Sequence, residues 1–253
     1  MYKRFLIHSL LLFSVVTSGF VLFNERKVAE NPALVKGVAV VELFTSEGCS
    51  SCPPADKLLR KMDAENKNVY VLSYHVDYWN RLGWKDPYSQ AAFTARQQHY
   101  ANRFALKSIY TPQVVVNGAE EFVGSDEPRL RSSITERSTV DHLDLQVKRT
   151  GAATLSISYT LSHPEPVFLH LALVQPQATT VVKRGENGGR TLHHVNVVRD
   201  FKTTEPQGAT GSAEITIPAD LQSTACDVIL FAQQKKSDRI TAAQRATVPL
   251  FAN

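Results

Sequence analysis

Two cysteines separated by two serines, Cys49 and Cys52, stand where a short apolar segment gives way to a helical pattern. Residues 38–44 are apolar and rich in β-branched side chains, which predicts a buried strand. After Pro53 the apolar residues recur at helical spacing, and prolines fit in a first helical turn because its N–H groups have no intrahelical partner. The cysteine pair is therefore expected in a loop between a strand and a helix, and any fold for this chain must contain that junction.

Strands and helices are predicted to alternate after this junction. Residues 69–76 and 113–117 are predicted to be strands, residues 89–106 and 126–139 helices, and a short strand is expected around Phe122. Such alternation implies parallel strands joined by crossover helices. With Cys-x-x-Cys at the first strand–helix junction and Thr111-Pro112 before the third strand, this order resembles the thioredoxin fold. We therefore expect an α/β thioredoxin-like domain over residues 38–140.

The sequence changes character after residue 141. Alternating or apolar runs begin at Leu143, Thr154, Val167, Glu214 and Cys226, and turns containing Gly or Pro separate them. This pattern is typical of an all-β domain. The expected fold class is thus an α/β thioredoxin-like domain followed by an all-β sandwich-like domain over residues 141–253, packed directly on each other because no flexible linker separates them.

The N-terminus has the pattern of an export segment. Lys3 and Arg4 precede an apolar run over residues 5–23 that contains no acidic residue. As a helix this run is roughly 28 Å long, close to the thickness of a bilayer core. Residues 1–23 are predicted to be a signal peptide or an uncleaved membrane anchor, and residues 24–37 a connector. Positive charge before the run predicts that the rest lies outside the cytoplasm, in the periplasm or secreted, with anchoring to the inner membrane as an alternative.

Composition excludes one class of partner. The formal charge is only +4, and Lys and Arg are scattered along the chain, so no nucleic-acid partner is expected. The hydrophobic fraction of 43% is enough to build a core.

The position of the cysteine pair predicts its chemistry. A thiol before a helix N-terminus meets the positive end of the helix dipole, which lowers its pKa. Cys49 is therefore expected to be the attacking thiol, more exposed and more acidic than Cys52, which resolves the mixed disulfide. A permanent disulfide and half of a zinc site are the alternatives.

Thr111 and Pro112 are the remaining residues expected in the catalytic site. The resemblance to thioredoxin-like proteins implies a cis Pro112 that faces the cysteine pair and a Thr111 backbone that holds a substrate chain. The alternative is an ordinary trans proline at the start of a strand.

Three polar residues in the predicted strands are candidates for a supporting role. His75 and Asp77 stand at the carboxyl end of a strand, where open α/β sheets bind ligands. Glu42 lies in the strand before the cysteines and resembles the buried acid of thioredoxins, with one extra residue of spacing. A polar group satisfied by its neighbours is the alternative for His75.

A glycine-rich turn supplies three further candidates. Gly185, Gly188 and Gly189 favour a tight turn that presents Arg184, Glu186 and Arg190 toward the cysteines, or a solvated hairpin tip. His193 and His194 are adjacent and point to opposite faces of a strand, and Cys226 is expected to be a buried free thiol.

The motifs carry a closer resemblance. Residues 41–56, 75–80, 110–113 and 184–192 are similar to the bacterial family called domain of unknown function 1223 (DUF1223). This resemblance implies a secreted or periplasmic, thioredoxin-like protein with no established substrate. The hypothesis is a thiol–disulfide oxidoreductase that acts on protein or small-molecule thiols, without metal or cofactor. The alternative is a non-catalytic binding module, either a metal carrier that uses Cys49, Cys52 and His75 or a scaffold with a static disulfide.

Overall fold

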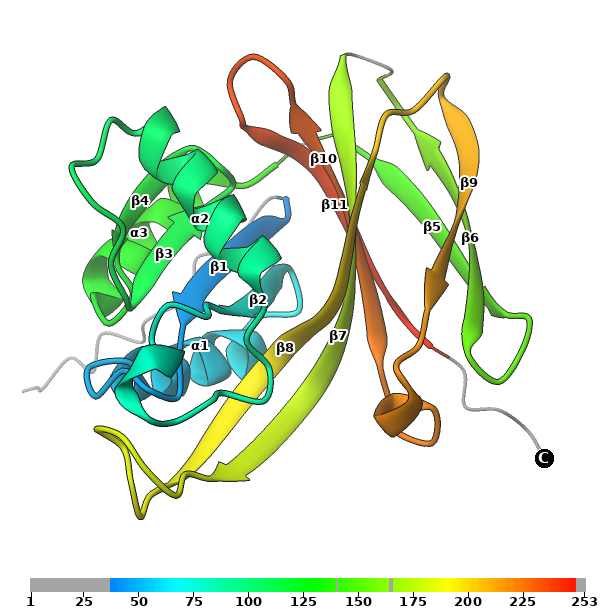
Figure 1. Cartoon of the computed structure of the whole chain (residues 1–253). Coiled ribbons are helices and arrows are strands. Elements are labelled where there is room, and N and C mark those ends of the chain that lie inside the picture. The colour runs from blue at the N-terminus through cyan, green and yellow to red at the C-terminus, as the bar shows by residue number, and fades with distance from the viewer. Residues whose placement is uncertain (1–36, 140, 164–165, 249–253) are drawn as a thin grey trace, which may run out of the picture. The chain divides into compact units, whose positions relative to one another are not determined.

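The computed structural model describes residues 37–139, 141–163 and 166–248, and these contain three α-helices and eleven strands (Figure 1). The helices are α1 (Pro53–Glu65), α2 (Ala91–Arg103) and α3 (Glu127–Arg137). The strands are β1 (Ala39–Thr45), β2 (Val69–His75), β3 (Gln113–Val116), β4 (Glu120–Val123), β5 (Leu143–Arg149), β6 (Thr154–Leu161), β7 (Val167–Val181), β8 (Thr191–Thr204), β9 (Thr210–Thr216), β10 (Asp227–Gln234) and β11 (Ile240–Thr247).

Eight of the strands form one mixed sheet in the order β11-β10-β7-β8-β2-β1-β3-β4. Only β1 with β2 and β2 with β8 are parallel pairs, and the other neighbours run antiparallel. A second sheet has three antiparallel strands in the order β5-β6-β9. The long strands β7 and β8 run between the helical region and the three-stranded sheet (Figure 1).

This architecture shows that the expected fold class is wrong. The chain is mostly β, and it is not an α/β thioredoxin-like domain followed by an all-β sandwich-like domain. The reason is the pairing of β8 with β2 at Val197 and Ser73, which adds β7, β10 and β11 to the sheet that contains β1. The expected crossover pattern also fails at β3, which is antiparallel to β1.

The domain boundaries stay a prediction. Strands from both sides of residue 140 lie in the eight-stranded sheet. The predicted leader, residues 1–23, lies outside the described residues, as does the connector except for Gly37. None of the helices in the described part of the chain has the length and apolar character needed to cross a membrane.

Alternation along the strands produces three hydrophobic clusters. In β1, Leu43 and its alternate neighbours face α1 and α3, whereas Phe44 faces the cluster that contains Phe93 of α2. In β7, Leu171 and Leu173 face the three-stranded sheet. The eight-stranded sheet is therefore buried on both faces, which explains why most of its strands are nearly continuous apolar runs.

A buried ion pair links β1 to α2 and, through Gln233, to β10. Glu42 of β1 lies 2.5 Å from the guanidinium of Arg96 in α2, and its other oxygen accepts a hydrogen bond from the Tyr100 hydroxyl. Arg96 and Tyr100 also contact the side-chain amide of Gln233 in β10. Burial makes this network sensitive to the loss of either charge.

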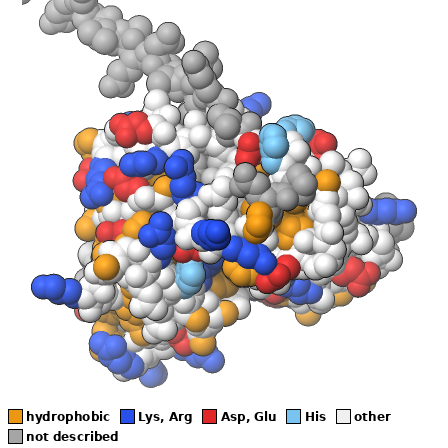
Figure 2. All heavy atoms as spheres, turned by 90° about the horizontal axis from the view of Figure 1, so that it is seen from above, with side chains coloured by type: hydrophobic (Ala, Val, Ile, Leu, Met, Phe, Trp, Pro, Cys, Tyr) orange, Lys and Arg blue, Asp and Glu red, His pale blue; other side chains and the backbone are white. Residues whose placement is uncertain are grey.

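Basic side chains lie at several separate places on the face shown in Figure 2, some of them beside acidic ones. Among the described residues, basic and acidic side chains form exposed pairs, such as Lys61 with Glu127 and Arg129 with Glu120. Such exposed pairs contribute little to stability.

Replacing Arg96 with Met tests the buried network. The change leaves the Glu42 carboxylate buried without its cation, so we expect the free energy of unfolding at pH 7 to fall by about 3–5 kcal/mol. Urea unfolding followed by circular dichroism measures this loss. The control is Arg103→Met at the end of the same helix, where the half-exposed pair with Asp238 should be worth less than about 1 kcal/mol. Equal losses in the two variants would contradict the assignment.

Candidate functional site

The Cys49–Cys52 pair forms a disulfide at the start of α1. The two Cα atoms are 5.5 Å apart, and Cys52 is the N-cap residue of the helix. Pro53 and Pro54 begin the helix without N–H groups, and the amides of Ala55 and Asp56 both donate to the carbonyl of Cys52. The junction between strand and helix thus has the predicted local structure, but no amide of its first turn is left to point at a sulfur.

The disulfide is covered from solvent. Both cysteines have an exposed fraction of 0%, so the prediction that Cys49 is the more exposed of the two is wrong. The hydroxyl of Ser51 lies 3.3 Å from Sγ of Cys49 and donates to the carbonyl of Thr111 at 3.5 Å. Exposed serines between two buried cysteines mean that the outer surface of the loop is polar, while its sulfurs face inward.

The loop with Thr111 and Pro112 lies against the cysteine loop. The Thr111–Pro112 peptide bond is cis, as the resemblance implied. The side chain of Thr111 accepts a hydrogen bond of 2.8 Å from the indole of Trp79, and the amide of Gly124 donates to the carbonyl of Pro112. These contacts hold Thr111 beside Ser51.

The tip of the β7–β8 hairpin, residues 182–190, reaches the same loop (Figure 1). The Asn187 amide is fully buried and donates to the carbonyls of Glu47 and Cys49 at 2.9 and 2.8 Å. Glu186 accepts a 3.0 Å hydrogen bond from the amide of Ser50, and the hydroxyl of Ser50, together with this amide, lowers the pKa of its carboxyl. The hairpin tip therefore binds the backbone on both sides of the first cysteine.

The two arginines of the hairpin tip have different surroundings. The guanidinium of Arg190 donates to Oδ1 of Asn187 at 3.1 Å, which fixes the orientation of that amide. Arg184 is exposed to solvent. Gly185 has a φ of 75°, in the left-handed region where glycine is favoured, and this turn aims Glu186 at Ser50.

A buried group of acids and a histidine lies behind the disulfide loop. Nε2 of His194 in β8 is 3.3 Å from Oε1 of Glu47, and Nδ1 is 3.5 Å from Oδ1 of Asp56 in α1. The other oxygens of Glu47 and Asp56 accept hydrogen bonds from Trp84 and Thr45. Burial alone lowers the pKa of His194, but the carboxylates of Asp56 and Glu47 raise it to about 9. His194 is therefore a buried cation at neutral pH.

A second buried pair adjoins this group. Nδ1 of His75 lies 2.7 Å from the Asp86 carboxylate, which also accepts from the amide of Glu47. Burial raises the pKa of Asp86, but the nearby His75 and these hydrogen bonds lower it below its usual value. The ring of His75 meets the ring of His194 edge to face, with centroids 4.7 Å apart. We call these five residues, Glu47, Asp56, His75, Asp86 and His194, the acid–histidine cluster.

The remaining predicted residues lie in other surroundings. Glu42 is held by Arg96 and Tyr100 on the face of β1 that packs against α2. The Asp77 carboxylate accepts a 2.6 Å hydrogen bond from Thr94. The structure brings together five of the predicted residues in one group of loops: Cys49, Cys52, Thr111, Pro112 and Glu186. His75 lies outside this group and packs on the ring of His194.

Sequence reasoning gave no role to Glu47, Asp56, Asp86, Asn187 or His194. The spacing of Cys52 and Asp56, four residues apart at a helix start, could have placed both on one helix face. Asn187 and His194 carried no such signal, because their positions depend on how β8 pairs. His193 and His194 do face opposite ways, and Cys226 is the buried free thiol that was expected.

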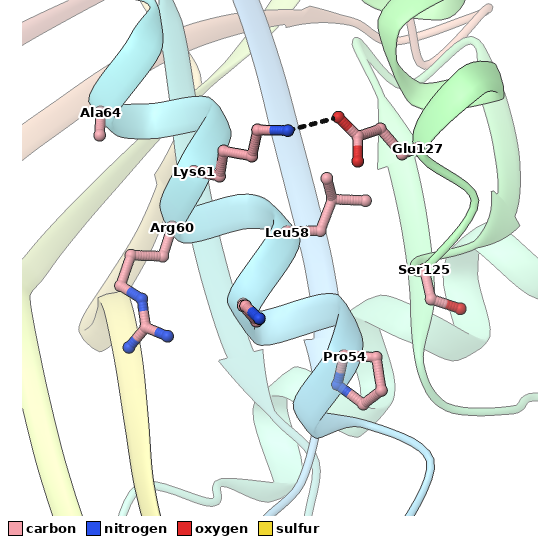
Figure 3. A pocket seen from close by; sticks show the side chains of 8 residues that line it. Pro54, Leu58, Arg60, Lys61, Ala64, Ser125 and Glu127 are labelled. Carbon is pink, nitrogen blue, oxygen red and sulfur yellow. Dashed lines mark hydrogen bonds and ion pairs between the residues drawn. The ribbon is translucent and has the colours of Figure 1, made fainter.

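A pocket of about 650 Å³ lies along the outer side of α1, and Figure 3 shows its lining residues. It begins at Pro54, two residues after Cys52, and extends past Leu58 to Ala64. Ser125 and Glu127 form its other side, and Lys61 reaches across to Glu127 at 2.9 Å. Among the described residues, no group of three or more His, Cys, Asp and Glu side chains is arranged to hold a metal ion.

One comparison with known proteins names a family. A sequence model of a family described as "Protein of unknown function (DUF1223)" matches residues 40–233. Protein AGR_C_4864 from Agrobacterium tumefaciens has a similar solved structure, with 28% identity, 86% of this chain and 97% of that chain covered, and a TM-score of 0.66. No curated protein matches the chain.

Other similar structures cover only part of each chain. A GH3 β-glucosidase from Bifidobacterium adolescentis has 12% identity, covers 43% of this chain and 17% of its own, and has a TM-score of 0.21. A β-glucuronidase 2 from Bacteroides uniformis has 12% identity, covers 44% and 14%, and has a TM-score of 0.22. Scores this low carry no argument about this chain.

Replacing Asn187 with Ala tests the cover over the disulfide. The change leaves the carbonyls of Glu47 and Cys49 without their donor, at a cost of about 1–3 kcal/mol, so the loop should open more often. We expect dithiothreitol to reduce the disulfide roughly tenfold faster, since 1.4 kcal/mol corresponds to a factor of ten. The control is Arg184→Ala in the same turn, which should reduce at the wild-type rate. An unchanged rate in the Asn187 variant would contradict the covering role.

His194 predicts how stability depends on pH. Its pKa is raised from about 6.5 in the unfolded chain to about 9, so its stabilisation is complete below pH 6.5 and is lost as the pH rises through 9. Between these values the oxidised wild-type protein should lose roughly 3 kcal/mol more than His194→Gln does. Urea unfolding at a series of pH values measures the difference. Parallel curves for the two proteins would show that His194 is not a buried cation.

Proposed function

We propose a function for this chain from its site, because the chain belongs to the DUF1223 family, as its motifs predicted, and the family's description names no activity. The proposed function is thiol–disulfide exchange at Cys49–Cys52, outside the cytoplasm, with protein or small-molecule thiols as substrates. The observation that carries it is a disulfide placed between an exposed Ser50-Ser51 loop and the N-cap of α1, with the Thr111 backbone beside it.

The reaction uses both sulfurs. A substrate thiolate attacks Sγ of Cys49, the Cys49–Cys52 bond breaks, and its electron pair moves to Sγ of Cys52, which takes up a proton. A second substrate thiolate then attacks the mixed disulfide and releases Cys49. Two substrate thiols leave as one substrate disulfide, and the protein gains two electrons and two protons. The same steps in reverse reduce a substrate disulfide.

Several features support the assignment of Cys49 as the attacked sulfur. Cys49 lies in the loop before the helix, and the Ser51 hydroxyl 3.3 Å from its sulfur can turn from the Thr111 carbonyl to donate to a thiolate there. Cys52 lies at the helix start, where a thiol has less freedom to meet a partner. The pocket that begins at Pro54, two residues after Cys52, offers room on the outer side of α1 for the rest of a substrate.

Exchange requires the residues that cover the disulfide to move. Both sulfurs are shielded by Ser51, Thr111 and the hairpin tip, so a substrate reaches them only when this loop opens. Loop opening is a normal feature of binding sites with low local stability. The location outside the cytoplasm is supported by the disulfide itself, since such bonds persist in oxidising compartments.

The complete burial of Cys49 and Cys52 favours a second candidate, a scaffold with a static disulfide. Structural disulfides resist reduction and have potentials below about −300 mV. Exchange-active disulfides have less negative potentials. The two candidates therefore differ in a quantity that glutathione or dithiothreitol redox buffers measure directly.

Replacing Cys52 with Ala tests the exchange function. Without the resolving thiol, Cys49 should stay joined to its partner, so incubation with glutathione disulfide should give one stable glutathione adduct by mass spectrometry. The control is Cys49→Ala with Cys52→Ala, which leaves only the buried Cys226 and should give no adduct. A wild-type potential below about −300 mV together with no adduct would leave the static disulfide as the function.

A further inference from the structure

The acid–histidine cluster lies next to the resolving cysteine. Cys52 and Asp56 are four residues apart at the start of α1, and the amide of Asp56 donates to the carbonyl of Cys52 at 3.2 Å. Residues with this spacing share one helix face, and helical side chains lean toward the helix N-terminus. Both side chains are buried. The Asp56 carboxylate therefore leans toward Cys52 on the inner face of the helix.

Three atoms of the cluster lack hydrogen-bond partners; one is Nε2 of His75, and the other two face each other. Oδ1 of Asp56 and Nδ1 of His194 are buried, and neither makes a hydrogen bond, although they lie 3.5 Å from each other. Unpaired buried polar atoms are costly and call for an explanation. The distance between these two atoms is slightly longer than that of a normal hydrogen bond, so a small movement of either side chain would allow a proton to pass between them.

The reaction at the disulfide needs a proton at this place. When the Cys49–Cys52 bond breaks, Cys52 becomes a thiolate among buried neighbours, and an unpaired buried charge is strongly unfavourable. Cys52 lies at the helix start and has no exposed surface when the loop is closed, so a donor inside the protein lies nearer to its sulfur than solvent does.

We infer that Asp56 and His194 store this proton and pass it to the Cys52 thiolate, an inference that rests on the proposed exchange function. The substrate thiolate attacks Sγ of Cys49, and the electron pair of the broken bond moves to Sγ of Cys52. A proton passes from Nδ1 of His194 to Oδ1 of Asp56, and from the Asp56 carboxyl to Cys52. The products are a mixed disulfide at Cys49, a neutral Cys52 thiol and a neutral His194, and disulfide formation returns the proton along the same path.

The charges around His194 suit this role. Glu47, from the loop after β1, faces Nε2, and Asp56, from α1, faces Nδ1. His75 at the end of β2 packs edge to face on the ring, and Asp86 binds Nδ1 of His75. Tyr88, from the same loop as Asp86, completes the ring contacts. Two carboxylates hold one proton on His194 at neutral pH, and the Asp56 side leads to the sulfur.

The test is the rate at which dithiothreitol reduces the disulfide, measured from pH 6 to 10 and divided by the concentration of dithiothreitol thiolate. For the wild-type protein this normalised rate should stay level up to about pH 9 and fall above it, as His194 loses its proton. General acids contribute about 10²–10⁴-fold. In His194→Gln and in Asp56→Asn we therefore expect a rate at least about tenfold lower below pH 9, without the change at that pH.

The matched control is His193→Gln. This neighbour lies on the opposite face of β8, is exposed and contacts Thr179, so its normalised rate should equal that of the wild type. A purely structural role for His194 would loosen the loop and raise the rate. Circular dichroism checks that each variant folds. If His194→Gln does not fold, Asp56→Asn, which keeps the shape of the side chain, carries the test alone.

The outcomes separate this inference from the proposed function. Suppose that the wild type exchanges disulfides, and that the disulfides of both variants are reduced as fast as that of His193→Gln, with the same pH profile, or faster. The inference that Asp56 and His194 supply the proton is then wrong, while the exchange function stands. If the Cys52→Ala variant forms no glutathione adduct and the wild-type potential is that of a static disulfide, the exchange function fails and the inference fails with it.

Discussion

The pairing of β8 with β2 is the constraint on which the rest of the structure depends. Val197 pairs with Ser73, and the Ser73 hydroxyl donates a buried 2.7 Å hydrogen bond to the carbonyl of Val195. This short contact adds four strands to the sheet that contains β1. It also fixes where the rest of β8 runs, so that His194 and the hairpin tip meet the cysteine loop. The contacts that β8 and the hairpin tip make with the site follow from it.

Local structure was predictable because it depends on neighbours in the chain. The proline pair at the start of α1 and the Asp126 cap of α3, which accepts from the amide of Arg129, are decided within a few residues. Strand pairing is different. In the sequence of β8, apolar residues such as Val195 and polar ones such as Arg199 do not alternate regularly, so the pattern gave little indication of a strand. The assumption that β-rich sequence after residue 141 forms its own sandwich failed for this reason.

The site was predictable to the same extent. Cys49, Cys52 and Thr111 were predicted from short motifs, and the structure places the three residues side by side. The role of Glu42 was inferred from spacing, but alternation along β1 turns its side chain to the face with Arg96. Asn187 lies in a segment whose resemblance to a family motif was recognised, yet its two hydrogen bonds to the cysteine loop require the three-dimensional path of the hairpin.

The proline pair of α1 has a consequence for how this family can vary. Helices that begin without prolines offer free amides to a nearby thiolate, but here the first available amides, those of Ala55 and Asp56, are already bound to the carbonyl of Cys52. The electrostatic environment of the sulfurs must therefore come from side chains such as His194, on a strand more than a hundred residues further along the chain. Evolution can thus adjust the reactivity of the pair through β8 while the Cys-Ser-Ser-Cys loop stays unchanged.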